Sequence, residues 1–307
     1  MPGWFCRRCA EPVGHQDRYC EQCGAWVAGL RRDRVEVDVG VAAGVSDRGR
    51  RHHRNEDALA LRDLGPNGAA VAIVCDGVSC SARPDEASET AAEVAAESLM
   101  TALHTHSTPI AATRQAIHAA GEAVAALAGS GGTGGRAPAC TLVSAIVTDD
   151  TVTIGWIGDS RAYWIPSAHA SSAPTRLTSD DSWLAQVVQG GTLSPTQAAA
   201  DRRAHAITAW LGEDAEQVDP HIITLEPDGP GVVVICTDGL WNYLDTVEEF
   251  AAAVPVEALQ DPLDAARQLV QVALHCGGRD NVTVAVLPFA SDLAGASIRP
   301  HFQRTIS

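Results

Sequence analysis

Five short apolar runs in this chain stand directly beside acidic residues, and this placement limits what the chain can fold into. Each run predicts a strand, so the acids mark strand ends. A single Asp after a strand is a common turn residue, but acids at the same edge of stacked sheets would converge on one pocket. The acids and their runs are Glu56-Asp57 before Ala58–Leu61, Asp76 after Val71–Cys75, Asp159 after Val152–Gly158, Asp238 after Val232–Thr237 and Asp280 before Val282–Phe289.

Converging carboxylates repel one another unless cations hold them, because uncompensated buried charge is costly. Ligands that are all oxygen favour hard ions, so the pattern indicates Mg²⁺ or Mn²⁺. Two such ions bridged by one Asp, with a water between them, form a hydrolytic centre in which the metal-activated water attacks phosphorus. Such a site needs no side-chain nucleophile, and the sequence has neither a Cys-x5-Arg loop nor a Gly-x-Ser-x-Gly elbow.

The predicted strands come in neighbouring groups and the predicted helices come in pairs. This order favours an α+β fold with antiparallel sheets flanked by helices over a doubly wound parallel sheet. The strands are predicted over Val35–Ala42, Ala69–Cys75, Thr141–Val147, Thr151–Ile157, Arg161–Ile165, His221–Leu225, Gly231–Cys236 and Asn281–Pro288, and the helices over Pro84–Leu103, Pro109–Ala128 and Pro262–Cys276. Thr178–Gly212 is predicted to be a helical insertion, and Gly129–Pro138 a glycine-rich loop.

The composition describes an ordinary globular protein, with 46% hydrophobic residues and a mean hydropathy of −0.01. No apolar run reaches the roughly 18–20 residues that cross a bilayer, and the first residues lack the apolar core of a secretory signal. We therefore expect a cytoplasmic protein without a membrane partner. The net charge of −16 argues against nucleic-acid binding, which needs clustered cations.

Four of the nine cysteines form two Cys-x-x-Cys pairs, separated by ten residues, at the N-terminus. Four thiolates in this arrangement close a tetrahedral structural zinc site, and zinc would supply the folding energy of so short a module. A redox pair, or chance cysteines in a disordered tail, is the alternative that the paired spacing argues against. The ligands would be Cys6, Cys9, Cys20 and Cys23, and the segment resembles the zinc-ribbon modules of bacterial proteins.

Six short motifs resemble, in order and at comparable spacing, the signatures of the PPM protein phosphatases, the type 2C-like class. They are Ser46-Asp47-Arg48-Gly49, Asn55-Glu56-Asp57, Val74-Cys75-Asp76-Gly77, Ile157-Gly158-Asp159-Ser160-Arg161, Cys236-Thr237-Asp238-Gly239-Leu240-Trp241 and Arg279-Asp280-Asn281-Val282-Thr283. Each motif alone is weak evidence, but the ordered set is strong. The resemblance implies a four-layer α-β-β-α sandwich of two antiparallel sheets, and Mg²⁺- or Mn²⁺-dependent hydrolysis of phosphoserine and phosphothreonine on proteins.

The resemblance also implies a role for each matching residue. Asp76 matches the ligand that bridges the two metals, and the Gly77 carbonyl matches a ligand of the second metal. Asp238 and Asp280 match ligands of the first metal. The remaining matches are Glu56 to the acid that holds waters of the second metal, Asp159 to the acid of a third, weaker metal position, Asn281 to a residue that orients the site, and Thr178–Gly212 to the flap.

One position departs from the family pattern. The family usually has an arginine that grips the substrate phosphate five residues before the Asp of Asn-Glu-Asp, and this sequence has His52 there. Histidine lacks the bidentate, permanently charged fork of arginine. Three outcomes are open: His52 binds phosphate more weakly and with pH dependence, Arg51 or Arg54 takes its place, or turnover is reduced.

The sequence leaves two alternatives to a protein phosphatase. A catalytically weak or inactive PPM-like adapter would bind phosphoproteins or partners without turnover, and a third function would be the hydrolysis of small phosphoesters. The predicted domains are a zinc ribbon over 1–28, a linker over 29–35, a phosphatase domain over 36–290 and a tail over 291–307. The family implies a bacterial serine/threonine kinase whose products are the substrates, and we expect a monomer.

Overall fold

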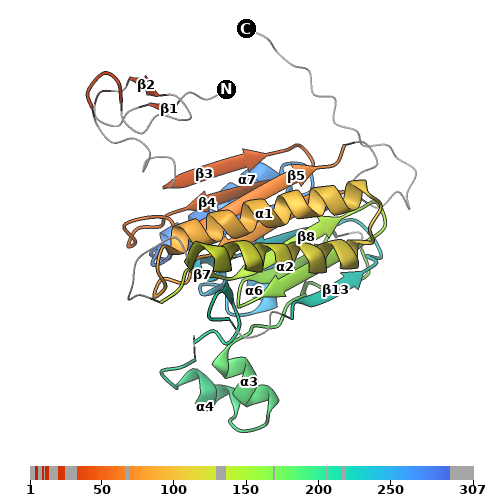
Figure 1. The fold of residues 1–307 in the computed structure, drawn as a ribbon. Helices are drawn as coiled ribbons and strands as arrows, with labels where there is room; N and C mark the ends of the chain where they lie inside the picture. The colour runs from red at the N-terminus through yellow and green to blue at the C-terminus, as the bar shows by residue number, and fades with distance from the viewer. Residues whose placement is uncertain are drawn as a thin grey trace.

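The computed structural model describes residues 4–5, 9, 11–13, 20–24, 33–65, 69–128, 136–168, 170–204, 206–215 and 219–290. Two sheets lie face to face and helices cover their outer faces (Figure 1). The first sheet has the order β13 (His221–Leu225), β9 (Val152–Ile157), β8 (Leu142–Val147), β6 (Ala70–Asp76), β5 (Asp57–Asp63). The second has the order β11 (Thr175–Arg176), β10 (Arg161–Pro166), β14 (Gly231–Cys236), β15 (Val282–Phe289), β4 (Ala43–Asp47), β3 (Arg34–Asp38).

Every neighbouring pair of strands in these two sheets is antiparallel. Helices α1 (Pro84–His104) and α2 (Pro109–Ala128) pack on the five-stranded sheet, and α6 (Val247–Ala253) and α7 (Pro262–His275) pack on the six-stranded sheet. The predicted four-layer sandwich of two antiparallel sheets flanked by helices is therefore confirmed.

Three layers of buried apolar side chains hold the sandwich together. The middle layer lies between the two sheets and includes Val143, Ile154 and Val233, each fully buried. The layer under α1 and α2 is rich in alanine, such as Ala91 and Ala95, and such small side chains let the helices lie close to the sheet and to each other. Burial of this apolar area supplies most of the favourable free energy of folding.

The first residues of three helices are of types that favour a helix start. Helix α1 begins with Pro at its first position and acids in its first turn, which suit the positive end of the helix dipole. Helix α7 begins where Asp261 accepts a hydrogen bond of 2.9 Å from the Asp264 amide. Helix α6 has a capping box in which Thr246 and Glu249 satisfy each other's backbone amides.

The start of the sheet differs from the prediction. The run Val35–Ala42 was predicted to be one strand, but the chain turns at Gly40, whose φ of 85° is left-handed, and Asp38 accepts a hydrogen bond from the Gly40 amide. The two arms are β3 and β4, which pair with each other. Strand β3 begins at Arg34, inside the predicted linker over 29–35.

The predicted helical insertion forms two short helices, α3 (Trp183–Gln189) and α4 (Pro195–Ala199). They project from one end of the sandwich (Figure 1). The two small strands at the N-terminus, β1 (Trp4–Phe5) and β2 (Pro12–Val13), pair antiparallel. Most of the predicted glycine-rich loop, residues 129–135, and the predicted tail, residues 291–307, lie outside the described residues. No helix in the described part of the chain is both long and apolar enough to cross a membrane.

Candidate active site

The four aspartates predicted to bind Mg²⁺ or Mn²⁺, together with the predicted ligand Gly77, lie on the wall of one pocket of about 590 Å³. Asp76 ends β6, Asp159 follows β9, Asp238 follows β14 and Asp280 stands before β15. Antiparallel pairing explains why they meet, because the end of one strand lies beside the start of its neighbour. Asp57, at the start of β5, is directly opposite Asp76. The four acids are spread around the wall, and in the described residues no three acids bring carboxylate oxygens within 4.8 Å of one another.

The acids of this pocket are held in an environment that disfavours their negative charge. Burial, reinforced by the repulsion of neighbouring aspartates, raises the pKa of Asp76 and of Asp238 well above the ordinary value. Burial and the Asp180 charge raise the pKa of Asp159 to about 6. Burial raises the pKa of Asp57 to about 7 despite hydrogen bonds from two threonines. The pocket therefore has more carboxylate than its protein surroundings compensate.

Asp57 ties the two sheets together beneath the pocket. Its Oδ2 accepts hydrogen bonds of 2.9 Å from Thr237 Oγ1 and 2.8 Å from Thr283 Oγ1, both on the six-stranded side. Its other oxygen, Oδ1, is buried without a hydrogen-bond partner. A buried carboxylate oxygen without a donor is costly, and a nearby cation would offset that cost.

Asn281 fixes the loop that carries Glu56. The Asn281 side chain donates hydrogen bonds of 2.8 Å to the Arg48 carbonyl and 3.1 Å to the Arg54 carbonyl, and accepts one of 2.7 Å from the Glu56 amide. Glu56 in turn accepts 2.8 and 2.9 Å hydrogen bonds from Ser79 Oγ and Arg54 Nε. The Glu56 carboxylate thus contacts Ser79, which lines the pocket, although Glu56 itself is not among the described lining residues.

Two glycines beside the acids are required by close packing. A Cβ at Gly239 would lie 1.8 Å from the Asn281 carbonyl oxygen, and a Cβ at Gly77 would lie 2.4 Å from the Pro84 carbonyl oxygen. The chain therefore passes so close to its neighbours after Asp238 and after Asp76 that only glycine fits. These contacts fix the backbone on which the two aspartates stand.

The basic residues predicted to bind phosphate lie in three different settings. His52 Nε2 is 3.1 Å from Asp280 Oδ1, so its ring contacts a pocket acid directly. Arg54 pairs with Glu56 at 2.9 Å and with Asp85 at 3.3 Å. Arg51 is exposed. The described lining of the pocket includes none of the three.

Several residues near the pocket have roles that the sequence analysis did not assign. Arg161 makes a two-point ion pair with Asp180, at 2.9 and 2.7 Å, and its guanidinium lies 3.5 Å over the Trp241 ring. The ion pair joins β10 to the start of the predicted flap. Arg136, within the predicted glycine-rich loop, lines the pocket itself. An arginine within a glycine-rich loop gives no periodic or motif signal, so the sequence does not mark it as a site residue.

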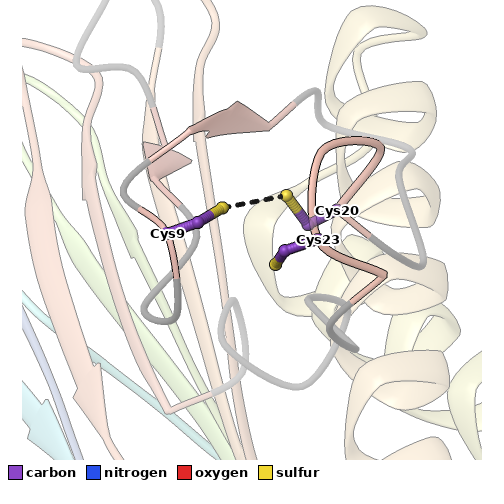
Figure 2. Close-up of side chains that lie close together, drawn as sticks. All are labelled: Cys9, Cys20 and Cys23. Atoms are coloured by element: carbon purple, nitrogen blue, oxygen red, sulfur yellow. Dashed lines mark hydrogen bonds between the residues drawn. The ribbon is translucent and has the colours of Figure 1, made fainter.

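The N-terminal cysteines form a separate cluster (Figure 2). The Sγ atoms of Cys9, Cys20 and Cys23 all lie within 4.8 Å of one another, with 3.5 Å between Cys9 and Cys20. The Gly24 amide donates to the Cys20 carbonyl, and the positive φ of Gly24 closes the knuckle that holds Cys20 and Cys23. Cys6, the fourth predicted ligand, lies outside the described residues.

Known proteins of one kind share this sequence pattern and this fold. The family model described as Protein phosphatase 2C matches residues 46–274. The serine/threonine phosphatase stp of Listeria monocytogenes is 27% identical over 249 residues, which cover 79% of this chain and 93% of that protein. The chain belongs to the protein phosphatase 2C family, and the enzyme class predicted from the sequence, a protein phosphatase, is confirmed.

Solved structures agree with this assignment. The PPM Ser-Thr phosphatase MsPP from Mycobacterium smegmatis, in complex with cacodylate, is 26% identical, with a TM-score of 0.64 over 83% of this chain and 100% of that chain. The catalytic domain of the serine/threonine protein phosphatase PstP, in complex with two manganese ions, is 26% identical, with a TM-score of 0.59 over 83% of this chain and 99% of that chain.

Proposed function

We propose that this protein removes phosphate from phosphoserine and phosphothreonine side chains of other proteins, in a reaction that depends on Mn²⁺ or Mg²⁺. The observation that carries the proposal is the pocket wall shared by Asp76, Asp159, Asp238 and Asp280. A relative named a serine/threonine phosphatase and a similar structure with two manganese ions support it. The substrates would be the products of a serine/threonine kinase of the same cell, and the protein would act as a cytoplasmic monomer.

The residues of the pocket fit such ions. Aspartate and backbone carbonyl oxygens are the ligands that Mn²⁺ and Mg²⁺ prefer, and the raised pKa values of Asp76 and Asp238 show that their negative charge lacks compensation. The unpartnered Oδ1 of Asp57 points to the same need. A pocket that gathers this much carboxylate is stable in its charged form only with cations present.

The proposed roles follow the positions that the residues occupy. Asp76 would bridge two ions, the Gly77 carbonyl would join it on the second, and Asp238 and Asp280 would complete the first. Asp159 would hold a third, weaker ion. Glu56 would hold waters of the second ion, after its carboxylate turns from the contacts with Ser79 and Arg54.

Bound ions of this type lower the pKa of coordinated water and offset charge on phosphoryl oxygens. The protein holds the acidic residues of the pocket in position. Asn281 holds the loop of residues 48–56 in place through three hydrogen bonds. Asp57 and its two threonines fix the strand ends from which Asp76 and Asp238 project. Because these supports come from both sheets, the acids keep their spacing while the substrate binds.

His52 is proposed to orient Asp280, since its Nε2 lies 3.1 Å from that carboxylate. Arg54 is held by two carboxylates. Arg54 would have to leave both of them before it could bind the substrate phosphate as the family's arginine does. We therefore assign most of the compensation of the substrate's charge to the metal ions. We propose the active phosphatase over the inactive adapter because the acids that match the family's metal ligands are all present, whereas His52 in place of the family's arginine is the feature that favours reduced turnover.

The test is phosphate release from a phosphothreonine peptide and from p-nitrophenyl phosphate, each with Mn²⁺ and with EDTA. We expect release from the peptide that requires Mn²⁺ and exceeds release from the small ester in kcat/KM. Equal or greater kcat/KM on the small ester would favour a small-phosphoester hydrolase. No release from either substrate, by protein shown to bind Mn²⁺, would favour the adapter.

The N-terminal residues 1–28 are proposed to form a structural zinc module with Cys6, Cys9, Cys20 and Cys23 as ligands. Three of these thiols already lie within 4.8 Å of one another (Figure 2), which is the spacing that tetrahedral Zn–S bonds of about 2.3 Å allow. A four-thiolate site has no open position, so the module would serve docking or localisation and not catalysis. The phosphatase domain would follow a short linker and run from Arg34 to about residue 290, ahead of the tail at 291–307.

A further inference from the structure

Among the described residues that line the active-site pocket, Arg136 is the one with a positively charged side chain. The same lining contains five aspartates: Asp76, Asp159, Asp214, Asp238 and Asp280. The ions proposed above would engage four of them. Two other arginines near the site are held by carboxylates: Arg54 by Glu56 and Asp85, and Arg161 by Asp180. Arg136 differs from them, because the side-chain contact it makes is to the Cys80 thiol, at 3.0 Å.

The backbone of Arg136 is fixed to the loop that follows Asp76. The Ala82 amide donates a 3.1 Å hydrogen bond to the Arg136 carbonyl, and the Val78 amide donates one of 2.9 Å to the Ala139 carbonyl. Ser81 Oγ accepts a third, from the Ala139 amide. Although Arg136 follows a glycine-rich stretch, its Cα is therefore held at a defined place beside the aspartates.

The exposure of Arg136 places its guanidinium at the rim of the pocket and not at its base. Arg136 and Cys80 are both exposed, whereas Asp76 and Asp238 are partly buried. Ile207 and Trp210, from the end of the predicted flap, also line the pocket. A phosphorylated side chain that reaches the aspartates would leave the adjoining residues of its peptide beside this rim.

Resting on the proposed function, we propose that Arg136 determines substrate specificity by binding a carboxylate side chain next to the phosphorylated residue. An arginine offers a planar fork of donors that matches a carboxylate. The chain as a whole carries a net charge of −16, but charges farther than about 10 Å away are largely screened by salt. Asp214, the aspartate of this wall that the proposed ions do not engage, accepts a hydrogen bond of 3.0 Å from the Trp210 indole. Arg136 is thus the group of this wall that can bind a carboxylate, and acidic phosphopeptides are the preferred class.

The test uses three substrates and three proteins. The substrates are a phosphothreonine peptide with Glu on both sides of the phosphothreonine, the same peptide with Gln at those positions, and p-nitrophenyl phosphate. The proteins are the wild type, Arg136→Gln and the control Arg114→Gln, which changes an exposed arginine of α2 that pairs with Asp219. For the wild type and Arg114→Gln we expect a kcat/KM about five- to tenfold higher on the Glu peptide than on the Gln peptide.

For Arg136→Gln we expect this preference to fall to about one, through a higher KM on the Glu peptide, with p-nitrophenyl phosphate turnover unchanged. Arg136→Glu should prefer a peptide with Arg at the flanking positions. A preference that survives in Arg136→Gln, or an equal loss on all three substrates, would overturn the inference. Absence of turnover by the wild type on every substrate would instead refute the proposed function.

Discussion

The indole Nε1 of Trp241 donates a hydrogen bond of 3.0 Å to the backbone carbonyl oxygen of Asp159. Trp241 ends the short helix α5 (Asp238–Trp241), which begins at another pocket acid. The same ring lies under the Arg161 guanidinium, which is paired with Asp180. One aromatic side chain thus connects two acids of the pocket with the base of the predicted flap.

Replacing Trp241 with Phe keeps most of the apolar contact but removes the hydrogen bond to Asp159. We expect the unfolding free energy to fall by about 1 kcal/mol, and the Mn²⁺ concentration for half-maximal turnover to rise about tenfold. The control is Trp183→Phe, at a tryptophan that stacks on Arg203 in the insertion. The same Mn²⁺ requirement in both variants would show that Trp241 does not position Asp159.

Gly239→Ala tests the close packing behind Asp238. The new Cβ would lie 1.8 Å from the Asn281 carbonyl oxygen, so the backbone of both residues must move. We expect the unfolding free energy to drop by about 3 kcal/mol or more, with loss of turnover in whatever folds. Gly190→Ala, at a glycine with ordinary φ at the end of α3, should change stability by less than about 0.5 kcal/mol.

Protein stripped of metal should lose stability as the pH rises. Burial raises the folded-state pKa of Asp57 to about 7 and of Asp159 to about 6, above the ordinary 3.8. Between these values the folded state holds protons that the unfolded state has released, so unfolding becomes easier from about pH 4 to about pH 7. Denaturant unfolding in EDTA should show a decline of more than about 1 kcal/mol over that window.

Two comparisons test whether the loss of stability with rising pH comes from the buried carboxylates. Mn²⁺ should flatten or reverse the decline, because it stabilises the charged carboxylates. Asp57→Asn should reduce the slope in EDTA, since it removes one of the raised groups while an amide oxygen can still accept from Thr237 or Thr283. Metal-free protein that is more stable at about pH 8 than at about pH 5 would contradict the assigned burial of these acids.

The cysteine cluster predicts one tightly held zinc per chain. Cys20→Ser should lose that zinc, measured by elemental analysis after dialysis against Mn²⁺, because a hydroxyl is a poor substitute for a thiolate. Cys276→Ser, at an exposed cysteine beyond α7, should keep it. Phosphopeptide turnover should stay within about twofold of the wild type in both variants, since a four-thiolate site has no open position. Collapse of turnover in folded Cys20→Ser would show that the module takes part in catalysis.

Much of the sandwich could be predicted because its elements are long and periodic. Helix α2 has the predicted bounds, as do β13 and β14. The elements that were predicted wrongly or missed depend on local turns and short segments, which hydrophobic periodicity does not reveal. The turn at Gly40 divides one alternating run into two strands, and α5 and α6 are too short to show a helical period.

The candidate site also has a part that the sequence could predict and a part that it could not. Acids at strand ends could be predicted to meet, because antiparallel pairing brings strand starts and strand ends together, as with Asp57 and Asp76. Contacts between distant segments could not be predicted. The contact of His52 with Asp280 depends on how two loops fold against each other, and the position of Arg136 depends on three hydrogen bonds to the loop after Asp76.

The most direct test of metal-dependent catalysis at this pocket is phosphate release from a phosphothreonine peptide by wild type and by Asp238→Asn, with Mn²⁺ and with EDTA. Asp228→Asn, at an aspartate that accepts a hydrogen bond from Ser172 away from the pocket, is the matched control. We expect Mn²⁺-dependent release by the wild type and the control, and none above the EDTA background by Asp238→Asn. Release by folded Asp238→Asn at the wild-type rate would contradict the account.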